Sequence, residues 1–384
     1  MLIRNSKLLS VTVSLFLVAC GGGGYVESGE DGALTRTGTF SIVANGEIYS
    51  NTDALIFKFD PFDNQTLLQL RQNEKLDDVF VGDSEFEKTL RLKNWVKSLW
   101  DHSVPAPFPP YNAVVILDWI RSGQTGGWCG QYSIVLLQSL LSLGYQARYI
   151  EIGNKSNPYA HFMVEVWSNQ FNKWIALDAD YNVHWEAHGV PLSALEIHDA
   201  YVKNKVNELD VIKGERMDPY ANPDWWPDKM SELFYYYRVT SQLDQLTRPD
   251  YPYSRMSDYV EWNDNLTVPW EFSTYPSEYP KEKLTDVSTN RREVIDAKLN
   301  QVVLSFLTAN PDNVQLSFIN NSVEFKLYEL LELDKNGNQI ALYKTTASSY
   351  HWYPSNFDVQ LQIRAMNSIG VYGPPSIVSF KRKT

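Results

Sequence analysis

Residues 126–144 read GGWCGQYSIVLLQSLLSLG, and they decide how the centre of this chain is expected to fold. Between Gln131 and Leu143 the apolar residues recur at helical spacing, and Gly144 follows as a residue that commonly ends a helix. A helix beginning near Gly130 would place the sulfur of Cys129 at its N-terminus. Unpaired backbone N–H groups and the positive end of the helix dipole favour a thiolate over a thiol there.

Cys129 has no partner for a disulfide, because the only other cysteine, Cys20, belongs to a targeting segment. A single cysteine with a histidine and an acid later in the chain is the sequence outline of a thiol nucleophile. A buried and inert thiol is the alternative when the cysteine is considered alone. The neighbouring glycines at 126, 127 and 130 allow close approach to the backbone, and the N–H of Cys129 is a candidate oxyanion donor.

A β-hairpin downstream supplies the histidine and the acid. Residues 161–167 and 174–178 have the alternation of strands, and the polar residues 168–172 between them form a turn. A turn centred between Asn169 and Gln170 puts His161 directly opposite Asp178, with both side chains on one face of the sheet. We therefore expect Asp178 to orient the imidazole of His161, whose other nitrogen reaches Cys129.

The same register predicts the remaining pairs of the hairpin. Met163 would face Ala176 and Glu165 would face Trp174, whereas the opposite face, which should be the buried one, holds five apolar residues: Phe162, Val164, Val166, Ile175 and Leu177. A slip of one residue would move the aspartate to the other face. Asp180 shares the parity of Asp178, so one local bulge would exchange the two acids.

These residues resemble the transglutaminase-like superfamily, and their local spelling is similar to its microbial and peptide:N-glycanase branches. The resemblance rests on the Cys129 helix, on LGYQARY at 143–149, on HFMVEV at 161–166 and on WIALD at 174–178. It covers residues 85–185. It implies a papain-like α+β core in which Cys129 is the nucleophile, His161 the base and Asp178 the orienting acid. It also implies a thioester formed from an amide and resolved by an amine or by water.

Some positions depart from the family pattern. The family's second oxyanion group lies upstream of the cysteine and varies; Gln124 and Trp128 are the candidates here. Gly130 follows the cysteine where animal cross-linking enzymes have a tryptophan, which argues against protein cross-linking. No acidic loop has the spacing of Ca²⁺ ligands, and we expect neither a cofactor nor a metal.

The N-terminus resembles a bacterial lipoprotein signal. Arg4 and Lys7 precede the apolar residues 8–18, and Cys20 follows Ala19 and precedes four glycines. The resemblance implies a signal peptide at 1–19, lipidation of Cys20, and a flexible tether at 20–36. An ordinary secretory signal is the alternative. We expect the protein in the bacterial cell envelope, lipid-anchored, at the outer membrane or on the periplasmic face if the cell is Gram-negative.

The overall charge limits the partners. The net charge of -12 disfavours nucleic acid and anionic lipid, because both require a cationic surface. The membrane contact is therefore expected through the covalent anchor. The expected substrate is a peptide or protein amide, including one linked to a cell wall or a glycan.

The regions around the catalytic core divide as follows. Residues 37–299 are assigned to the transglutaminase-like domain, with short strands at 37–59, a helix opened by a capping box at 84–87, and an apolar helix or strand at 113–120. Residues 191–296 are rich in aromatics and should form short helices and ordered loops. Their aromatics either pack in the core, which we favour, or line a groove for an extended substrate.

His184, Glu186 and His188 would suit a metal only if they lay on a helix; surface histidines are the favoured interpretation. His102 and His198 carry no pattern that marks them as functional.

From residue 300 onward the pattern changes to short strands separated by turns, which predicts a β-sandwich. The strand candidates are 302–307, 314–318, 324–331, 340–345 and 359–365. Residues 361–376 resemble the last strands of a fibronectin type III domain, so 300–384 are assigned to a fibronectin type III or immunoglobulin-like sandwich.

Two functions remain open on the sequence. The first is an exported cysteine enzyme of transglutaminase-like type. The second is a non-catalytic binding or scaffolding lipoprotein that retains the fold.

Overall fold

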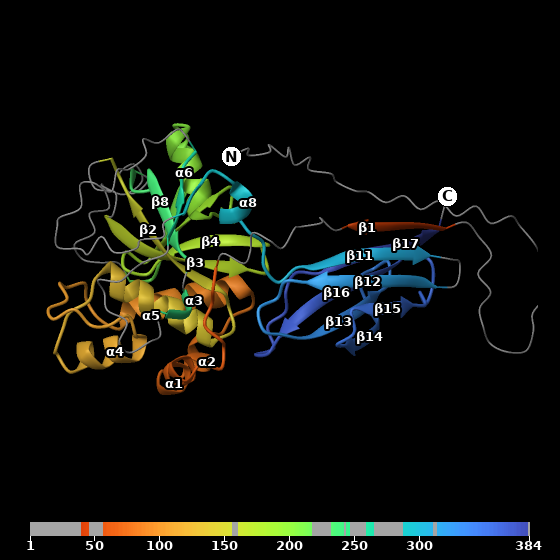
Figure 1. Cartoon of the computed structure of the whole chain (residues 1–384), viewed down its shortest axis with the longest axis horizontal. Helices are drawn as coiled ribbons and strands as arrows, with labels where there is room; N and C mark the ends of the chain where they lie inside the picture. Colours follow the sequence, from red (N-terminus) through yellow and green to blue (C-terminus); the bar gives the residue numbers. More distant parts are fainter. Residues whose placement is uncertain are drawn as a thin grey trace, which may run out of the picture. The chain divides into compact units, whose positions relative to one another are not determined.

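The computed structural model describes residues 40–45, 57–155, 160–216, 232–241, 243–245, 259–264, 287–309 and 313–382 (Figure 1). They form two compact units. The first comprises Thr52–Leu299 together with Ser368–Val371, and the second comprises Asn300–Asn367 and Tyr372–Thr384 with the N-terminal strand β1 (Phe40–Asn45). The predicted signal peptide, Cys20 and the tether lie outside the described residues. No helix in the described part of the chain is long and apolar enough to span a membrane.

The first unit opens with five helices. They are α1 (Gln65–Asn73), α2 (Leu76–Val79), α3 (Glu85–Ser98), α4 (Ala113–Arg121) and α5 (Cys129–Ser142). The hydroxyl of Ser84 caps α3 by accepting from the N–H of Glu87 at 3.1 Å, which is one half of the predicted capping box. The other half differs, because the carboxylate of Glu87 accepts from the N–H of Asp83 at 2.9 Å. The segment at 113–120, which the sequence left as helix or strand, is helical.

Helix α5 is the centre of this unit. Every residue from Gly130 to Ser142 is buried, because α1, α3 and α4 pack around it and the sheet covers another side. Its polar Gln138 fixes α4: the side-chain oxygen accepts from the N–H of Ala113 at 2.8 Å, and the amide donates to the carbonyl of Tyr111 at 2.9 Å. Gly144 ends the helix with φ of 86°, which glycine adopts without strain.

A nine-stranded sheet lies against these helices (Figure 1). Its order is β10-β9-β8-β2-β3-β4-β5-β6, with β7 paired to β5, and only β9 and β10 run parallel. The strands are β2 (Ala147–Gly153), β3 (His161–Ser168), β4 (Lys173–Asp178), β5 (Val183–Ala187), β6 (Val190–Pro191), β7 (Asp210–Lys213), β8 (Tyr236–Thr240), β9 (Tyr259–Trp262) and β10 (Val287–Thr289).

The predicted register of the β3–β4 hairpin is wrong by two residues. Glu165 pairs with Ala176, and Trp167 pairs with Trp174, so the turn is centred one residue later than expected. The cause lies in the turn: Asn172 takes a left-handed φ of 55°, and Glu85 at the start of α3 accepts hydrogen bonds from three groups of the turn. A shift of two preserves parity, so each side chain keeps its face.

Both faces of the β3–β4 hairpin are buried. Val164, Val166, Ile175 and Leu177 pack on the helices, as expected. The opposite face, which carries Met163 and Ala176, is covered by a second core that includes α6 (Ala194–Val202) and α8 (Arg292–Ile295). The expectation that only one face is buried is therefore wrong.

The aromatic-rich region 191–296 supplies more regular structure than the sequence suggested. Its strands β8, β9 and β10 extend the sheet beyond β2. Tyr235, Tyr237 and Trp262 are buried, which agrees with the packing interpretation for these residues. Trp225, Trp226 and Trp270 lie outside the described residues.

A buried ionic network ties this region to the hairpin. Arg148 on β2 donates to Glu165 on β3 at 2.8 Å, to the hydroxyl of Tyr237 on β8 at 3.0 Å and to the carbonyl of Ile295 at 2.6 Å. Glu165 also accepts from the N–H of Ala194 at the first residue of α6 at 2.7 Å. The side chains of Arg148 and Glu165 are both fully buried.

The second unit consists of two antiparallel sheets that share one hydrophobic core. One has the order β1-β17-β16-β13-β14, and the other has the order β11-β12-β15. The strands are β11 (Val302–Ala309), β12 (Val314–Asn320), β13 (Phe325–Leu333), β14 (Gln339–Thr345), β15 (Ser349–Trp352), β16 (Val359–Asn367) and β17 (Ser376–Arg382).

Strand β1 differs from its assigned place. Residues 37–299 were predicted to form one domain, but β1 pairs antiparallel with β17 over its whole length and so extends the C-terminal sheet. The sequence pattern also missed β15, a strand of four residues that pairs with β12.

Candidate active site

Cys129 is the first residue of α5, preceded by Trp128 at the N-cap. The cysteine is free and half-buried, so part of it faces solvent. The side-chain oxygen of Gln131 accepts from the N–H of Trp128 at 3.2 Å and fixes the entry into the helix. The sulfur therefore lies at a helix N-terminus, where the dipole favours a negative charge.

His161 is the first residue of β3, and Asp178 is the last residue of β4. The Nε2 atom of His161 lies 2.7 Å from Oδ2 of Asp178, and their side chains are 5% and 0% exposed. The other carboxylate oxygen of Asp178 accepts from the N–H of Tyr181 at 2.9 Å, which holds the carboxylate in place. Because Nε2 is bound to Asp178, Nδ1 is the ring nitrogen left for Cys129.

The His161 pKa is raised well above its ordinary value. Burial alone would lower it, but the charge of Asp178, its hydrogen bond, and the contact with Cys129 together outweigh the burial. The raised pKa favours the imidazolium, which is the state that pairs with a thiolate.

Asp180 lies beside this group but has other partners. Its carboxylate accepts from Nδ1 of His102 at 2.8 Å and 3.0 Å, and the ammonium of Lys97 lies 3.7 Å away. One carboxylate oxygen also lies within 4.8 Å of both the Cys129 sulfur and a ring nitrogen of His161. Asp178 is thus the carboxylate that accepts the hydrogen bond of His161, and Asp180 occupies the neighbouring position.

Two buried lysines on α3 interact with the two aspartates. Lys93 and Lys97 are one helical turn apart and are each 1% exposed. Lys93 donates to the side-chain oxygen of Asn182 at 2.6 Å and acts electrostatically on Asp178. Burial lowers the pKa of Lys93 to about 7, and the charge of Asp178 only partly opposes this.

Sequence reasoning missed His102 and both lysines. The signal for the lysines was present, because positions 93 and 97 fall on the apolar face of α3 beside Leu92 and Val96. For His102 there was none: its partner Asp180 is 78 residues away in the chain.

The two predicted oxyanion candidates have different surroundings. Gln124 is exposed, and its backbone N–H donates to the carbonyl of Trp119 at 2.8 Å. Trp128 lies next to Cys129 and is half-buried, with its ring centroid 5.4 Å from that of Phe108 in an edge-on arrangement. The structure therefore brings Trp128 to the cysteine and leaves Gln124 on the loop before it.

The glycines before Cys129 serve internal packing. A Cβ on Gly126 would lie 2.5 Å from the hydroxyl of Ser103, and one on Gly127 would lie 2.6 Å from Nε1 of Trp100. Gly126 and Gly127 therefore allow close packing against the residues that follow α3, and not the approach of a substrate that the sequence predicted for them. At Gly130 a Cβ would make only ordinary contacts, the nearest being the Tyr149 hydroxyl at 3.4 Å.

The histidines at 184 and 188 do not form the helical pair that a metal site would need. His184 lies on strand β5, where its Nε2 contacts Glu186 at 2.9 Å, and His188 lies in the following turn. In the part of the chain that the structure describes, His184, Glu186 and His188 do not come close enough together to bind one metal ion.

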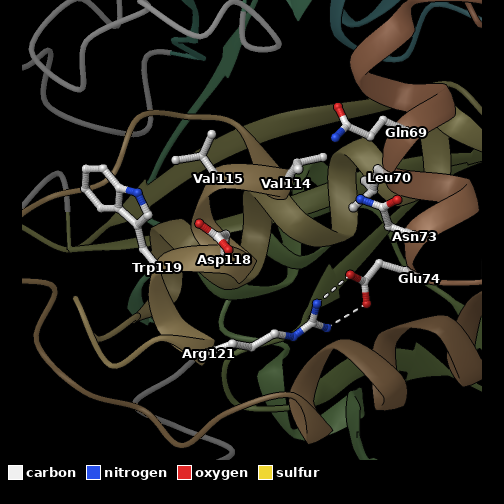
Figure 2. A pocket seen from close by; sticks show the side chains of 9 residues that line it. All are labelled: Gln69, Leu70, Asn73, Glu74, Val114, Val115, Asp118, Trp119 and Arg121. Carbon is white, nitrogen blue, oxygen red and sulfur yellow. Dashed lines mark hydrogen bonds and ion pairs between the residues drawn. The ribbon is translucent and has the colours of Figure 1, made fainter.

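A hollow of about 470 Å³ lies between α1 and α4 (Figure 2). Arg121 and Glu74 close one end of it with two hydrogen bonds of 2.7 Å. Its lining contains none of Cys129, His161 and Asp178, so we do not assign the chemistry to it. The lining residues are Gln69, Leu70, Asn73, Glu74, Val114, Val115, Asp118, Trp119 and Arg121.

A cysteine at a helix N-terminus, with a histidine and an aspartate on an adjacent antiparallel sheet, is a Cys-His-Asp group of the kind that suggests a cysteine enzyme. Residues 78–179 match the family described as the Transglutaminase-like superfamily, and the match contains all three residues. The chain thus carries a transglutaminase-like domain, as its sequence resemblance indicated. A search of the curated proteins found no relative.

Proposed function

We propose that this protein is an exported, lipid-anchored cysteine enzyme that forms a thioester with the acyl group of a peptide or protein amide. The single observation that supports this most is the position of His161, held by Asp178 at 2.7 Å with its second ring nitrogen left for Cys129. This arrangement supplies a nucleophile, a proton carrier and an orienting charge, which is what amide cleavage through a thioester requires.

In the first half-reaction the thiolate of Cys129 attacks the amide carbon, and the N–H of Cys129 at the start of α5 is a donor for the developing oxyanion. His161 then gives its Nδ1 proton to the leaving nitrogen, the C–N bond breaks, and a thioester remains. In the second half-reaction His161 takes a proton from water or from an amine. The new C–O or C–N bond forms, and the thiolate is released.

Asp178 contributes by fixing the ring. Its hydrogen bond to Nε2 selects the tautomer in which Nδ1 faces the cysteine, and its charge stabilises the imidazolium that appears in both half-reactions. Burial of both side chains strengthens this interaction by excluding water.

We further propose that Cys20 carries the lipid anchor and that residues 300–384 form a fibronectin type III-like sandwich. The second proposal is supported by two sheets with a shared core, the first running β14-β13-β16-β17 with β1 added beside β17, and the second running β11-β12-β15. Such a module would space or bind at the cell envelope. Partition of the full chain into a detergent phase, lost in Cys20→Ala, tests the anchor; equal partition of both would reject it.

The reaction type is tested with a glutamine-containing protein and a labelled primary amine. Incorporation of the amine that disappears in Cys129→Ala identifies transfer, and conversion of glutamine to glutamate without incorporation identifies hydrolysis. Incorporation no greater than in Cys129→Ala rejects transamidation. A Cys129 that also reacts slowly with iodoacetamide, at the same rate with and without His161, would favour the non-catalytic scaffolding alternative.

A further inference from the structure

Three metal-binding side chains converge at the cysteine. The sulfur of Cys129, a ring nitrogen of His161 and a carboxylate oxygen of Asp180 all lie within 4.8 Å of one another. They come from three separate elements: the start of α5, the start of β3 and the turn after β4. The sequence predicted no metal, and the group it offered as a candidate was His184, Glu186 and His188.

We propose that Cys129, His161 and Asp180 bind a divalent transition metal of the Zn²⁺ type, and that this metal reversibly blocks the thiol. Thiolate and imidazole are ligands that select zinc and its neighbours, whereas Ca²⁺ and Mg²⁺ require oxygen ligands. Zinc bonds of about 2.0–2.3 Å place tetrahedral ligands roughly 3.5 Å apart. The three atoms therefore need to close by little more than about 1 Å.

The groups behind the three ligands support the same assignment. Nε2 of His161 is bound to Asp178 at 2.7 Å, so the ring turns Nδ1 toward the metal position, as in carboxylate–histidine–metal sites. Asp180 is oriented by His102 at 2.8 Å and 3.0 Å. The ligands are thus held before a metal arrives, and little ordering is required on binding.

Two features make this a reversible site. Three protein ligands leave the fourth tetrahedral position to solvent, which reaches the half-buried Cys129. Lys97, 3.7 Å from Asp180, opposes a cation, so the affinity should be lower than that of a closed structural site. Metal binding displaces the proton shared by Cys129 and His161 to solvent.

The blocking effect follows from which atoms the metal takes. The Cys129 sulfur that attacks the substrate and the Nδ1 atom of His161 that carries the proton would both be coordinated. This part of the inference rests on the proposed function, whereas metal binding itself can be measured without any substrate.

Cobalt is the probe for the binding, because Co²⁺ occupies zinc sites and reports its ligands by absorption. Titration of the metal-free protein with Co²⁺ should produce a thiolate-to-cobalt charge-transfer band that saturates at one equivalent. Asp178→Asn, which removes the group that orients His161, should weaken Co²⁺ binding by about 10–100-fold. Asp180→Asn should weaken it at least as much, and Asp118→Asn, an exposed carboxylate in the α1–α4 hollow, should not change it.

Alkylation provides a test that needs no folded variant. Wild-type protein already alkylated at Cys129 should show no charge-transfer band, and Zn²⁺ should slow alkylation until a chelator is added. Absence of the band in the unmodified protein, or equal Co²⁺ affinity of Asp180→Asn and wild type, overturns the metal site. A protein that binds Co²⁺ as expected but acylates no substrate keeps the metal site and removes the proposed function.

Discussion

Replacing Asp178 by asparagine tests which aspartate orients His161. The side chain keeps its shape and one oxygen, but it loses the charge that faces Nε2 at 2.7 Å. Asp180→Asn is the matched comparison, because Asp180 lies within 4.8 Å of the same ring but hydrogen-bonds to His102 instead.

The size of the effect follows from the burial of the pair. With the side chains of His161 and Asp178 5% and 0% exposed, their charge-assisted hydrogen bond is worth about 2 kcal/mol. Each 1.4 kcal/mol is a factor of about ten, so the population of the imidazolium–thiolate pair should fall about 30-fold in Asp178→Asn. Asp180 acts on His161 through its charge alone, which Lys97 partly offsets, so a loss of about 1 kcal/mol, or about fivefold, is expected for Asp180→Asn.

The assay is the rate of alkylation of Cys129 by iodoacetamide at pH 7, followed by mass spectrometry. Circular dichroism of each variant shows whether the fold is retained. A larger loss of rate in Asp180→Asn than in Asp178→Asn, with both variants folded, would contradict the assignment of Asp178 as the orienting acid.

Three further predictions concern stability, each read from urea unfolding. Gly127→Ala should lower the free energy of unfolding by about 1–3 kcal/mol, because its Cβ would lie 2.6 Å from Nε1 of Trp100. Gly130→Ala, whose Cβ makes ordinary contacts in a helix, should not lower it. Equal losses of stability in the two variants would reject the packing argument. Burial lowers the pKa of Lys93 from 10.5 to about 7, so the unfolded chain binds a proton that the folded chain gives up, and stability should rise with pH between about 7 and 10.5. The rise in the free energy of unfolding amounts to as much as about 5 kcal/mol, and Lys93→Met should remove it. If the free energies of unfolding of wild type and Lys93→Met differ by the same amount at pH 7 and at pH 10, the prediction is wrong. Arg148→Met should lower the free energy of unfolding by about 3–5 kcal/mol, because it leaves Glu165 buried without its ion partner. Arg121→Met, which breaks the half-exposed pair with Glu74, should lower it by less than about 1 kcal/mol. A small loss in both variants would mean that the buried network does not stabilise the fold.

The parts of the site that the sequence predicted depend on local periodicity. The helix after Cys129 follows from apolar spacing over a dozen residues, and its end at Gly144 follows from one glycine. The sequence predicted that His161 and Asp178 meet because they lie directly opposite each other; that register is wrong, yet the two side chains do meet. Their meeting survives the error of two residues in register, because strand side chains alternate with a period of two.

The parts that were not predicted depend on contacts between distant segments. The turn of the hairpin is set by Glu85, more than eighty residues earlier, and β1 pairs with β17 at the other end of the chain. Strands β8, β9 and β10 extend the sheet by pairings that no local pattern reports. Such long-range choices are decided by packing and by buried polar partners rather than by propensity.

The buried lysines show where sequence reasoning is weakest. A lysine is expected at the surface, yet Lys93 and Lys97 face two aspartates inside the protein. Their burial is explained by the two carboxylates that face them, Asp178 at the end of β4 and Asp180 in the turn that follows.

The central claim is that Cys129 is a nucleophile made reactive by His161, and the most direct test is the rate at which iodoacetamide labels Cys129. At neutral pH the wild type should be labelled fast and His161→Ala slowly. At alkaline pH, where cysteines ionise unaided, the two rates should converge, which shows that access to the sulfur is unchanged. Equally slow labelling of wild type and His161→Ala at neutral pH would contradict the claim.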